Sequence, residues 1–431
     1  YRLHQALGDK VALTILEQHE TLGGHTCTVD IQDASGRTLA IDTGFMVFNK
    51  KTYPNLLTFL EALKIPYQKA DMSFSLQHRG LKVLGSSLEW NGAGLFKIFS
   101  QVRNLFNIRF WRMLMALNRF NQQAKVEGAK AENSSSDCDH LTVGEYVQQQ
   151  GFGDDFLTLF LLPISAAIWS MSPKDILNFP VRTLMRFFFN HGFLGINDHY
   201  QWYTIRGGAR QYIEALRGHL GEKTHWLTRT PVRKISRTIS GCLLTLANGE
   251  QHVFDHAILA THADQALAML DNPTELETRL LSAFKYEANE AILHTDASVM
   301  PRRKFCWASW NYRLDADDDM KASECQTSST HYWVSHLQSL KSKTPIFVSI
   351  NGGHLIDAAK RLKTLSFTHP IFTVPAIEAQ AHLPKINRQE PRQTVYFCGS
   401  YFKYGFHEDA FTAGLHAAES LMHHLGHYAS K

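Results

Sequence analysis

Residues 11–26 read VALTILEQHETLGGHT, and the prediction of the architecture starts from this stretch. Val11 to Leu16 is a continuous apolar run of strand length, as expected for a buried parallel strand. Glu17 follows the run directly, and Gly23 and Gly24 come shortly afterwards. In dinucleotide-binding folds, an acidic residue at the end of the second strand accepts hydrogen bonds from the ribose hydroxyls. The stretch therefore predicts an α/β fold with a Rossmann-type nucleotide-binding domain.

The glycine fingerprint of such a domain lies about 20 residues before the acidic residue. Counting back from Glu17 places it before residue 1, so we expect the first strand and the glycine loop to be absent from this sequence. Gly23 and Gly24 suit a backbone that passes close to a pyrophosphate or a flavin, where a β-carbon would collide. A surface glutamate followed by a Gly-Gly turn explains the same residues equally well, so support must come from elsewhere in the chain.

Length and composition set the broad class. A chain of 431 residues favours two domains, and 44% hydrophobic with 19% charged residues is typical of a packed globular protein. Lys and Arg number 44 against 40 Asp and Glu, a surplus too small to indicate a nucleic-acid partner.

The six cysteines are scattered without metal-binding spacing, which favours a reduced, cytoplasmic compartment and no metal site. The opening residues lack the apolar stretch of a signal peptide, and the apolar run 156–171 is too short to span a bilayer, so we expect a buried helix there.

A second pattern with a role in nucleotide binding lies near the end of the sequence. We expect a strand from Thr394 to Cys398, a turn that contains Gly399 and Ser400, and a helix from about Asp409 to Leu425. The free N–H groups and the dipole of a helix start favour a negatively charged ligand. Taken alone, the segment is also explained by the plain strand–turn–helix ending that is common in α/β proteins.

Several segments resemble one family. Glu17 followed by Gly23-Gly24 resembles the E-x5-G-G pattern of flavin-dependent amine oxidases and phytoene desaturases, with His25 in place of their usual arginine. Residues 41–49, IDTGFMVFN, resemble the strand and turn that pass beside the flavin in that superfamily. The chain is most similar to a bacterial branch of predicted NAD/FAD-binding, amine-oxidase-like flavoproteins. The matching segments lie between residues 23 and 421, and jointly they are specific: GGHTCTVD, IDTGFMVFN, HYQWYTIRGGARQYIEAL, CWASWNY and GSYFKYGFHEDAFTAGLHAAESL.

The resemblance implies an FAD cofactor. Because Cys398 precedes the glycine and is therefore off the pattern of covalent flavin attachment, we expect FAD to be bound non-covalently. Val232 belongs to a run whose backbone holds adenine in relatives, although the run is equally typical of an edge strand. Ser400 stands where many relatives have an acidic residue, so a backbone contact is expected there. The expected cofactor-binding residues are Glu17, Gly23, Gly24, His25, Thr26, Asp42, Thr43, Gly44, Phe45, Val232, Gly399, Ser400, His407, Glu408, Asp409 and Ala410.

The same resemblance implies a discontinuous domain organisation. Residues 1–70, 205–268 and 375–431 are expected to form the FAD-binding domain. Residues 71–204 and 269–374 are expected to form an inserted substrate domain of mixed α+β structure.

Candidate catalytic residues are His407, Tyr404 and Asn49, which the motif matches place near the flavin. The two carboxylates that follow His407 would hold it charged or let it act as a proton shuttle. The alternative is that Glu408 and Asp409 cap the closing helix, and we expect this role for Asp409. We find no zinc-binding helix, nucleophile elbow or P-loop, so hydrolase and kinase functions have no support.

The segment from Trp169 to Tyr203 is rich in aromatic residues, which suits an apolar substrate beside a flavin, although such residues more often form a domain core. The resemblance associates this branch with lipid modification. The expected function is therefore FAD-dependent oxidation or desaturation of an apolar, fatty-acyl or lipid, substrate by hydride transfer to flavin. The alternatives are a redox-neutral, flavin-dependent double-bond isomerase and a non-catalytic flavoprotein partner of a lipid-modifying enzyme.

Residues 95–125 mix apolar and basic side chains. A basic amphipathic helix of this kind can lie in a membrane interface, which would place the protein peripherally at the inner membrane. More often the pattern belongs to a helix with an apolar face on the core and a basic face in solvent. The apolar members are Phe96, Ile98, Phe99, Phe106, Phe110, Trp111, Met113 and Met115, and the basic members are Lys97, Arg103, Arg109, Arg112 and Arg119.

Overall fold

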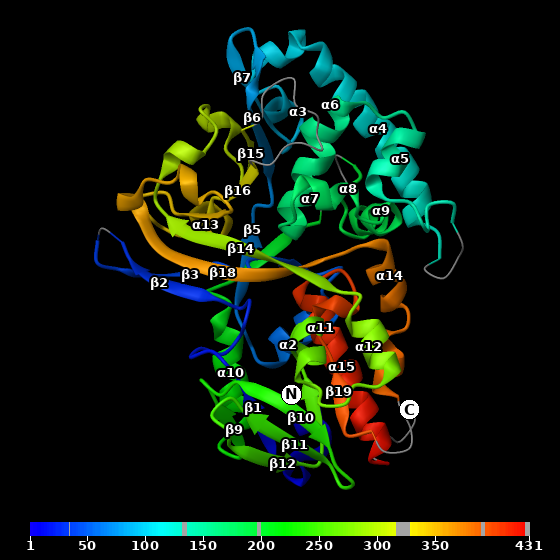
Figure 1. The fold of residues 1–431 in the computed structure, drawn as a ribbon. Coiled ribbons are helices and arrows are strands. Elements are labelled where there is room, and N and C mark those ends of the chain that lie inside the picture. Colours follow the sequence, from blue (N-terminus) through cyan, green and yellow to red (C-terminus); the bar gives the residue numbers. More distant parts are fainter. Residues whose placement is uncertain (34, 132–135, 196–199, 316–327, 389–392, 427–431) are drawn as a thin grey trace.

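The computed structural model describes residues 1–33, 35–131, 136–195, 200–315, 328–388 and 393–426. The resemblance segment that begins at His199 therefore starts just outside the described residues. The chain forms an elongated molecule with a lower half that carries both ends of the chain, an upper half rich in helices, and a waist of long strands between them (Figure 1).

The lower half contains the parallel strands that the sequence predicts. Strand β1 (Leu13–Leu16) pairs in parallel with β9 (Thr224–Leu227), and β13 (Ala257–Leu259) pairs in parallel with β19 (Val395–Phe397). An antiparallel sheet of β10 (Val232–Arg237), β11 (Cys242–Leu246) and β12 (Gln251–Phe254) lies beside them. Residues of β1 are half-buried instead of buried, because they line a large cavity. The helices of this half are α1 (Arg2–Leu7), α10 (Arg210–Leu220), α11 (Ala263–Met269), α12 (Glu275–Leu281), α14 (Val374–Gln380) and α15 (His407–His424).

A seven-stranded mixed sheet runs from the waist into the upper half (Figure 1). All its pairs are antiparallel except β15 with β6, which run in parallel. This sheet, together with the parallel pairs below it, confirms the predicted α/β class with a mixed second part. In spatial order its strands are β18 (Arg361–Ile371), β14 (Lys285–His294), β17 (Phe347–Ile350), β16 (Ser328–Tyr332), β15 (Trp310–Leu314), β6 (Phe74–Val83) and β7 (Ser86–Asn91).

The upper half is covered by a helical layer whose core contains Phe110, Phe120, Trp169 and Phe187. The predicted buried helix at 156–171 is confirmed as a helical stretch with buried side chains, interrupted by a π-helical turn at Leu157–Leu161. The turn lies just before Pro163, which cannot donate the regular helical hydrogen bond. The helices are α3 (Leu95–Ile98), α4 (Ile108–Gly128), α5 (Val143–Gln149), α6 (Asp154–Phe156), α7 (Leu162–Trp169), α8 (Pro173–Leu177) and α9 (Val181–Asn190).

Short elements complete the waist. The hairpin of β2 (Thr28–Gln32) and β3 (Thr38–Asp42) lies beside the large sheet, and β8 (Trp202–Ile205) is the centre of a small sheet with β4 (Phe48–Asn49) and β5 (Tyr67–Ala70). Helices α2 (Pro54–Ala62) and α13 (Val334–Leu337) flank these strands.

The packing moves one predicted domain boundary. Residues after 268 were expected in the substrate domain, but Leu280 and Leu281 of α12 are buried in the lower half. They pack in one cluster with Leu259, Ala263 and Phe397. The transition to the upper half therefore comes after α12, because the apolar face of that helix is complementary to the lower core.

Within the described ranges, we find no helix with the combination of length and apolar character that crossing a membrane requires.

Candidate functional site

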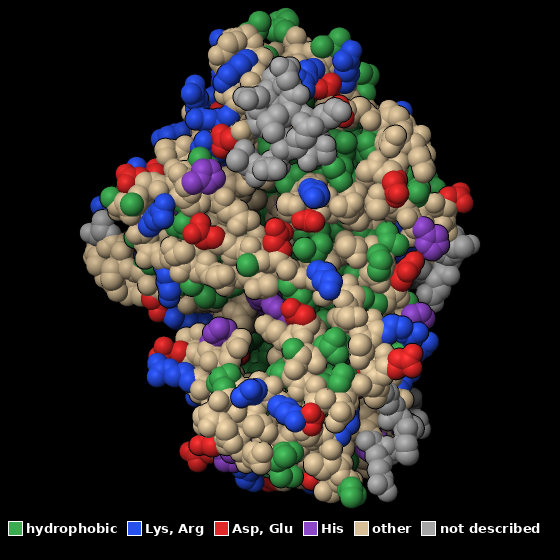
Figure 2. Space-filling model, viewed as in Figure 1, with side chains coloured by type: hydrophobic (Ala, Val, Ile, Leu, Met, Phe, Trp, Pro, Cys, Tyr) green, Lys and Arg blue, Asp and Glu red, His purple; other side chains and the backbone are tan. Residues whose placement is uncertain are grey.

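A continuous cavity of about 2550 Å³ runs from the lower half into the helical layer. On the face shown in Figure 2, the surface is hollowed between the waist and the lower half, with apolar side chains in its depth. The lining includes β1 and the residues after it, one face of α15, and aromatic residues from α7, α9, β15 and β16. All the predicted cofactor-binding residues line this cavity except Asp42, Glu408 and Asp409.

Glu17 lies at the lower end of the cavity, directly after β1. Its backbone is fixed on both sides, because its N–H donates to Leu227 O at 2.8 Å and its carbonyl accepts the N–H of Thr230 at 2.8 Å. One carboxylate oxygen accepts the N–H of His19 at 2.8 Å. No described residue donates to the second oxygen, which is therefore available to the hydroxyls of a ribose.

The loop after Glu17 approaches the cavity closely, as its glycines predict. Gly23 has φ +118°, and a β-carbon there would meet the carbonyl of Thr26 at 2.8 Å. Gly44 is equally restricted, because its β-carbon would lie 2.2 Å from the carbonyl of His25. Only glycine at these positions lets the two backbone segments pass each other beside the cavity.

His407, the first residue of α15, belongs to a hydrogen-bonded group in the cavity wall. Its Nε2 lies 2.9 Å from Thr26 Oγ1 and 3.2 Å from the hydroxyl of Tyr212, and these two hydroxyls also hydrogen-bond to each other. Its ring stacks on Phe45 at 3.8 Å between centroids. Burial, and then the nearby imidazole of His25, lower the pKa of His407 to about 3. The lowered pKa favours a neutral imidazole, which argues against one of the alternatives considered for His407, a histidine held charged by the next two carboxylates.

Glu408 and Asp409 point away from His407, because successive helical side chains diverge by about 100°. Asp409 accepts the N–H groups of Phe406 at 2.9 Å and Tyr404 at 3.1 Å, so its predicted capping role is confirmed. Glu408 was expected to cap the same helix, but it caps α2 instead: its carboxylate accepts the N–H of Asn55 at 3.0 Å and of Leu56 at 2.9 Å. Burial raises the pKa of Asp409 to about 7.

Asn49 and Tyr404 are two predicted catalytic residues that do not line the cavity. The Oδ1 of Asn49 accepts the N–H groups of Lys51 at 3.0 Å and Thr52 at 2.9 Å, so this side chain holds a turn. A fully buried asparagine whose amide is occupied by its own turn is not available for chemistry, and the catalytic expectation for Asn49 is corrected. Tyr404 contributes its carbonyl, which accepts the indole N–H of Trp169 at 3.2 Å.

Asp42 is also behind the cavity wall. Its carboxylate accepts the Thr28 hydroxyl at 2.6 Å, the N–H of Ala209 at 2.8 Å and the amide of Gln338 at 2.9 Å. Burial raises the pKa of Asp42 to about 6. It therefore organises the loop that carries Thr43 to Phe45 and has no direct access to a cofactor.

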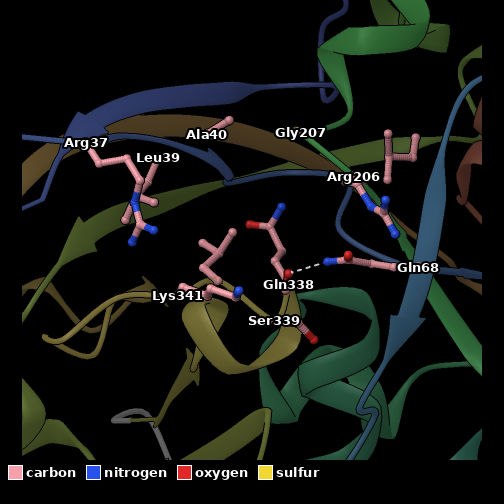
Figure 3. A pocket seen from close by; sticks show the side chains of 11 residues that line it. Arg37, Leu39, Ala40, Gln68, Arg206, Gly207, Gln338, Ser339 and Lys341 are labelled. Atoms are coloured by element: carbon pink, nitrogen blue, oxygen red, sulfur yellow. Dashed lines mark hydrogen bonds between the residues drawn. The ribbon is translucent and has the colours of Figure 1, made fainter.

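Gln338 in turn borders a second, small pocket of about 240 Å³, which shares no lining residue with the large cavity. Figure 3 shows Gln338 with the amide of Gln68, which donates to the Gln338 carbonyl at 2.8 Å, and Arg37, Arg206 and Lys341 around them. The pocket lies between the β2–β3 hairpin and the segment after α13, which also contact each other through the hydrogen bonds of Gln338 with Asp42.

The upper end of the cavity is an aromatic wall. Trp169 and Phe187 pack at 4.7 Å, Phe187 and Phe406 at 5.1 Å, and Trp310 and Tyr332 at 5.1 Å between ring centroids. The Tyr332 hydroxyl is already occupied, because it donates to Ala167 O at 3.1 Å. The charged side chains that line the cavity come from the lower half and β18: Arg2, Lys10, Glu17, Glu20, Asp255 and Lys363. Among the described lining residues, none from the helical layer carries a charge.

Three further lining residues were missed from the sequence. Tyr212 lies in a segment that contributed to the family resemblance, and this signal could have identified it. His262 follows β13 and His369 lies on β18, and neither position shows a motif. The His25 ring lies 5.3 Å from His369 and 6.3 Å from His262, so residues from three distant segments form one imidazole cluster in the cavity wall. Burial lowers the pKa of His25 to about 4 and that of His369 to about 3.

The residues present fit a dinucleotide cofactor. The β-carbon position of Gly24 meets no atom within 4 Å, which leaves room beside the loop for a phosphate chain. The buried Nε2 of His25 has no hydrogen-bond partner among the described residues, a costly state that a bound polar group or water would relieve. Glu17 and the start of α15 both lie at the cavity, and a carboxylate and a helix start are the kinds of group that suit a ribose and a phosphate.

Comparisons with known proteins agree with this geometry. The family described as flavin-containing amine oxidoreductase matches residues 1–321. A search of curated protein sequences found no match.

Solved structures show the same fold. Putrescine oxidase bound to putrescine is 13% identical, with a TM-score of 0.66 over 98% of this chain and 96% of that one. Cyclohexylamine oxidase from Brevibacterium oxydans IH-35A is 15% identical, with a TM-score of 0.65 over 99% and 96%. A fatty acid isomerase from P. acnes that produces CLA is 13% identical, with a TM-score of 0.62 over 95% and 92%.

Proposed function

Because this chain belongs to the flavin-containing amine oxidoreductase family and is therefore an FAD-dependent oxidoreductase, we propose that it oxidises or desaturates a neutral, apolar substrate of the fatty-acyl or lipid type. One observation carries the proposal. A single cavity joins the nucleotide-binding residues around Glu17 to an aromatic wall with no charged side chain. An amine substrate would carry a positive charge, and this wall offers no carboxylate to pair with it.

The lower part of the cavity is proposed to hold FAD. Glu17 would accept hydrogen bonds from the ribose, and Val232 lies in the wall where the adenine would pack. Gly23 and Gly24 give room for the pyrophosphate, and the Gly399–Ser400 backbone with Ala410 of α15 borders the remaining part. When bound, FAD supplies a hydride acceptor that no side chain provides.

The residues of the aromatic wall bind the substrate and exclude water from it. Phe187 and Phe406 stack on each other and are apolar. The indole of Trp169 and the hydroxyl of Tyr332 are hydrogen-bonded to backbone carbonyls, whereas the buried indole N–H of Trp310 has no partner among the described residues. His407, Thr26 and Tyr212 form the polar boundary between the two parts of the cavity. Their hydrogen bonds fix the ring of His407 against Phe45 and so position the loop beside the flavin.

Non-covalent binding of FAD is part of the proposal. Cys398 lines the cavity, but burial raises the pKa of its thiol to about 12. A protonated thiol is a poor nucleophile, so attachment to the flavin is not expected at this residue. Acid precipitation of the protein should release all the flavin into the supernatant.

The deciding experiment is anaerobic mixing of the FAD-loaded protein with two substrate sets, long-chain fatty-acyl compounds and primary amines of similar length. Bleaching of the flavin absorbance by the acyl set alone supports the proposal, and bleaching by the amine set alone overturns it. The fold shared with a fatty acid isomerase makes double-bond isomerisation the second candidate, which would appear as product without net bleaching. If neither substrate set bleaches the flavin or yields a product, the result would favour the third candidate, a non-catalytic partner of a lipid-modifying enzyme.

A further inference from the structure

The segment of residues 90–126, at the upper end of the molecule, combines exposed apolar side chains with basic residues, of which Arg109 is paired with Asp155. Residues 90–126 contain six basic residues and no acidic one, whereas the chain as a whole has 44 basic and 40 acidic residues. In this region Phe96 is 92% exposed and Phe106 is 79% exposed. Large apolar side chains that gather on a surface in this way mark an interaction site.

Helix α4 has two apolar faces with different surroundings. Phe110, Met113 and Phe120 are fully buried in the core of the helical layer. Ile108, Trp111 and Met115, spaced i, i+3 and i+7, form an opposite stripe that is exposed by 66%, 42% and 64%. A core-facing helix explains the first face and leaves the second largely exposed, although the ring of Trp111 lies 5.5 Å from that of Phe99.

The outer stripe continues into the turns that precede α4. Phe96, Val102 and Phe106 lie in this stretch, and the indole of Trp111 donates to Leu105 O at 2.9 Å, which ties α4 to it. We call the set Phe96, Val102, Phe106, Ile108, Trp111 and Met115 the apical patch. The apical patch belongs to the outer surface and not to a groove, because its residues line neither of the two cavities described above.

Basic side chains border the apical patch. Lys97 and Arg112 make no ion pair within the described part of the chain, and Arg103 donates to the Leu84 carbonyl and the Ser86 hydroxyl at the tip of the β6–β7 hairpin. Lys82 and Lys304 add exposed charge at the sides. Figure 2 shows apolar and Lys/Arg side chains together at the end of the molecule that carries β7 and α3.

We propose that the apical patch docks on the surface of an anionic phospholipid bilayer. The apolar side chains would enter the boundary between headgroups and acyl chains, and the surrounding cations would pair with lipid phosphates. Charge complementarity selects this occupant, since unpaired cations on flexible stems suit a fluid anionic surface. The patch lies on the outer side of the same helical layer whose α9 lines the aromatic wall with Phe187, so docking would place that layer next to lipid.

The test is flotation of the full-length, FAD-loaded protein with vesicles of phosphatidylcholine alone or mixed with phosphatidylglycerol. We expect binding to the mixed vesicles that weakens as salt is added. The variants Phe106→Ser with Trp111→Ser, and Lys97→Glu with Arg112→Glu, should each weaken binding about tenfold or more. The matched control, Ile239→Ser with Leu362→Ser, removes apolar side chains that are 88% and 48% exposed elsewhere and should change nothing.

Three results would overturn the proposal: no binding to mixed vesicles, equal binding by patch and control variants, or a dimer in light scattering that the patch variants dissociate. All variants should keep their flavin absorbance, because the patch lies outside the cavity. Turnover of a soluble short-chain substrate tests the proposed function separately, so failure of one proposal is distinguishable from failure of the other.

Discussion

Among single residues, Glu17 makes the most specific prediction. Its backbone is held by two hydrogen bonds, and one carboxylate oxygen has no partner among the described residues. Glu17→Gln keeps the shape and removes the charge, so FAD should bind roughly tenfold to a hundredfold more weakly. Titration of FAD fluorescence measures this loss, and Glu222→Gln, an exposed position away from the cavity, is the control. Equal affinities for both variants would contradict the ribose contact.

Glu408 leads to a prediction about the free energy of unfolding, although the sequence placed it among the cofactor-binding residues. Its carboxylate accepts the N–H groups of Asn55 and Leu56, which are the orphan donors at the start of α2. Glu408→Ala should therefore lower the free energy of unfolding by about 2 kcal/mol, and Glu408→Gln should recover part of it. Urea unfolding tests this against Glu419→Ala on the same helix, whose partner Arg2 is 3.9 Å away and which should cost less than about 0.5 kcal/mol. A loss at Glu408 no larger than at Glu419 would rule out the cap.

At the scale of elements, α15 offers a position where the effect of a substitution on protein stability can be distinguished from its effect on FAD binding. Gly414 lies in the middle of this helix and lines the cavity, and its β-carbon position meets no atom within 4 Å. Gly414→Ala should stabilise the protein without cofactor by about 0.5–1 kcal/mol while weakening FAD binding. Gly218→Ala in α10 is the control, because that position is equally open but does not line the cavity, so only stability should rise. If both variants bind FAD equally well, the cofactor does not pass along α15.

The elements themselves differed in how well the sequence predicted them. Strand β19 and helix α15 agree with their predicted ranges within two residues, because a glycine turn and apolar periodicity define them locally. The roles of Asn49 and Glu408 were not predictable in this way. Each depends on a hydrogen bond whose partner is fixed by turn geometry or by a helix more than 350 positions away. The imidazole cluster of His25, His262 and His369 forms only when three segments meet, and single positions carry no sign of it.

For the whole molecule, the α/β class and the family were predictable, since Glu17, the Gly23–Gly24 pair and the closing strand and helix are short motifs set by the chemistry of nucleotide binding. The position of the domain boundary after α12 was not, because it depends on which core the apolar face of that helix matches. The exposed stripe on α4 was visible in the sequence as an excess of apolar residues. Only the packing of α4 separates the face that joins the core from the face that remains outside.

The pH dependence of stability is a prediction for the whole molecule. Burial lowers the pKa of His25, His191 and His294 to about 4 and that of His369 and His407 to about 3. These folded-state values lie below the unfolded value of about 6.5, so below that pH the unfolded chain binds more protons than the folded one. Each histidine then removes about 1.4 kcal/mol of stability per pH unit as the pH falls toward its folded pKa.

Two buried carboxyl groups act in the opposite direction. Burial raises the pKa of Asp42 to about 6 and of Asp409 to about 7, so the folded state holds these protons and gains stability as the pH falls. The five histidines outnumber the two carboxyl groups, and the free energy of unfolding should therefore decrease from about pH 7 to about pH 5. Urea unfolding across this range measures the slope. His191→Phe keeps the stacking on Phe187, which is 3.9 Å away, and removes one titrating group, so its slope should be shallower by about 1.4 kcal/mol per pH unit. A stability that stays constant or rises over the same range would show that these imidazoles are not buried in their neutral form.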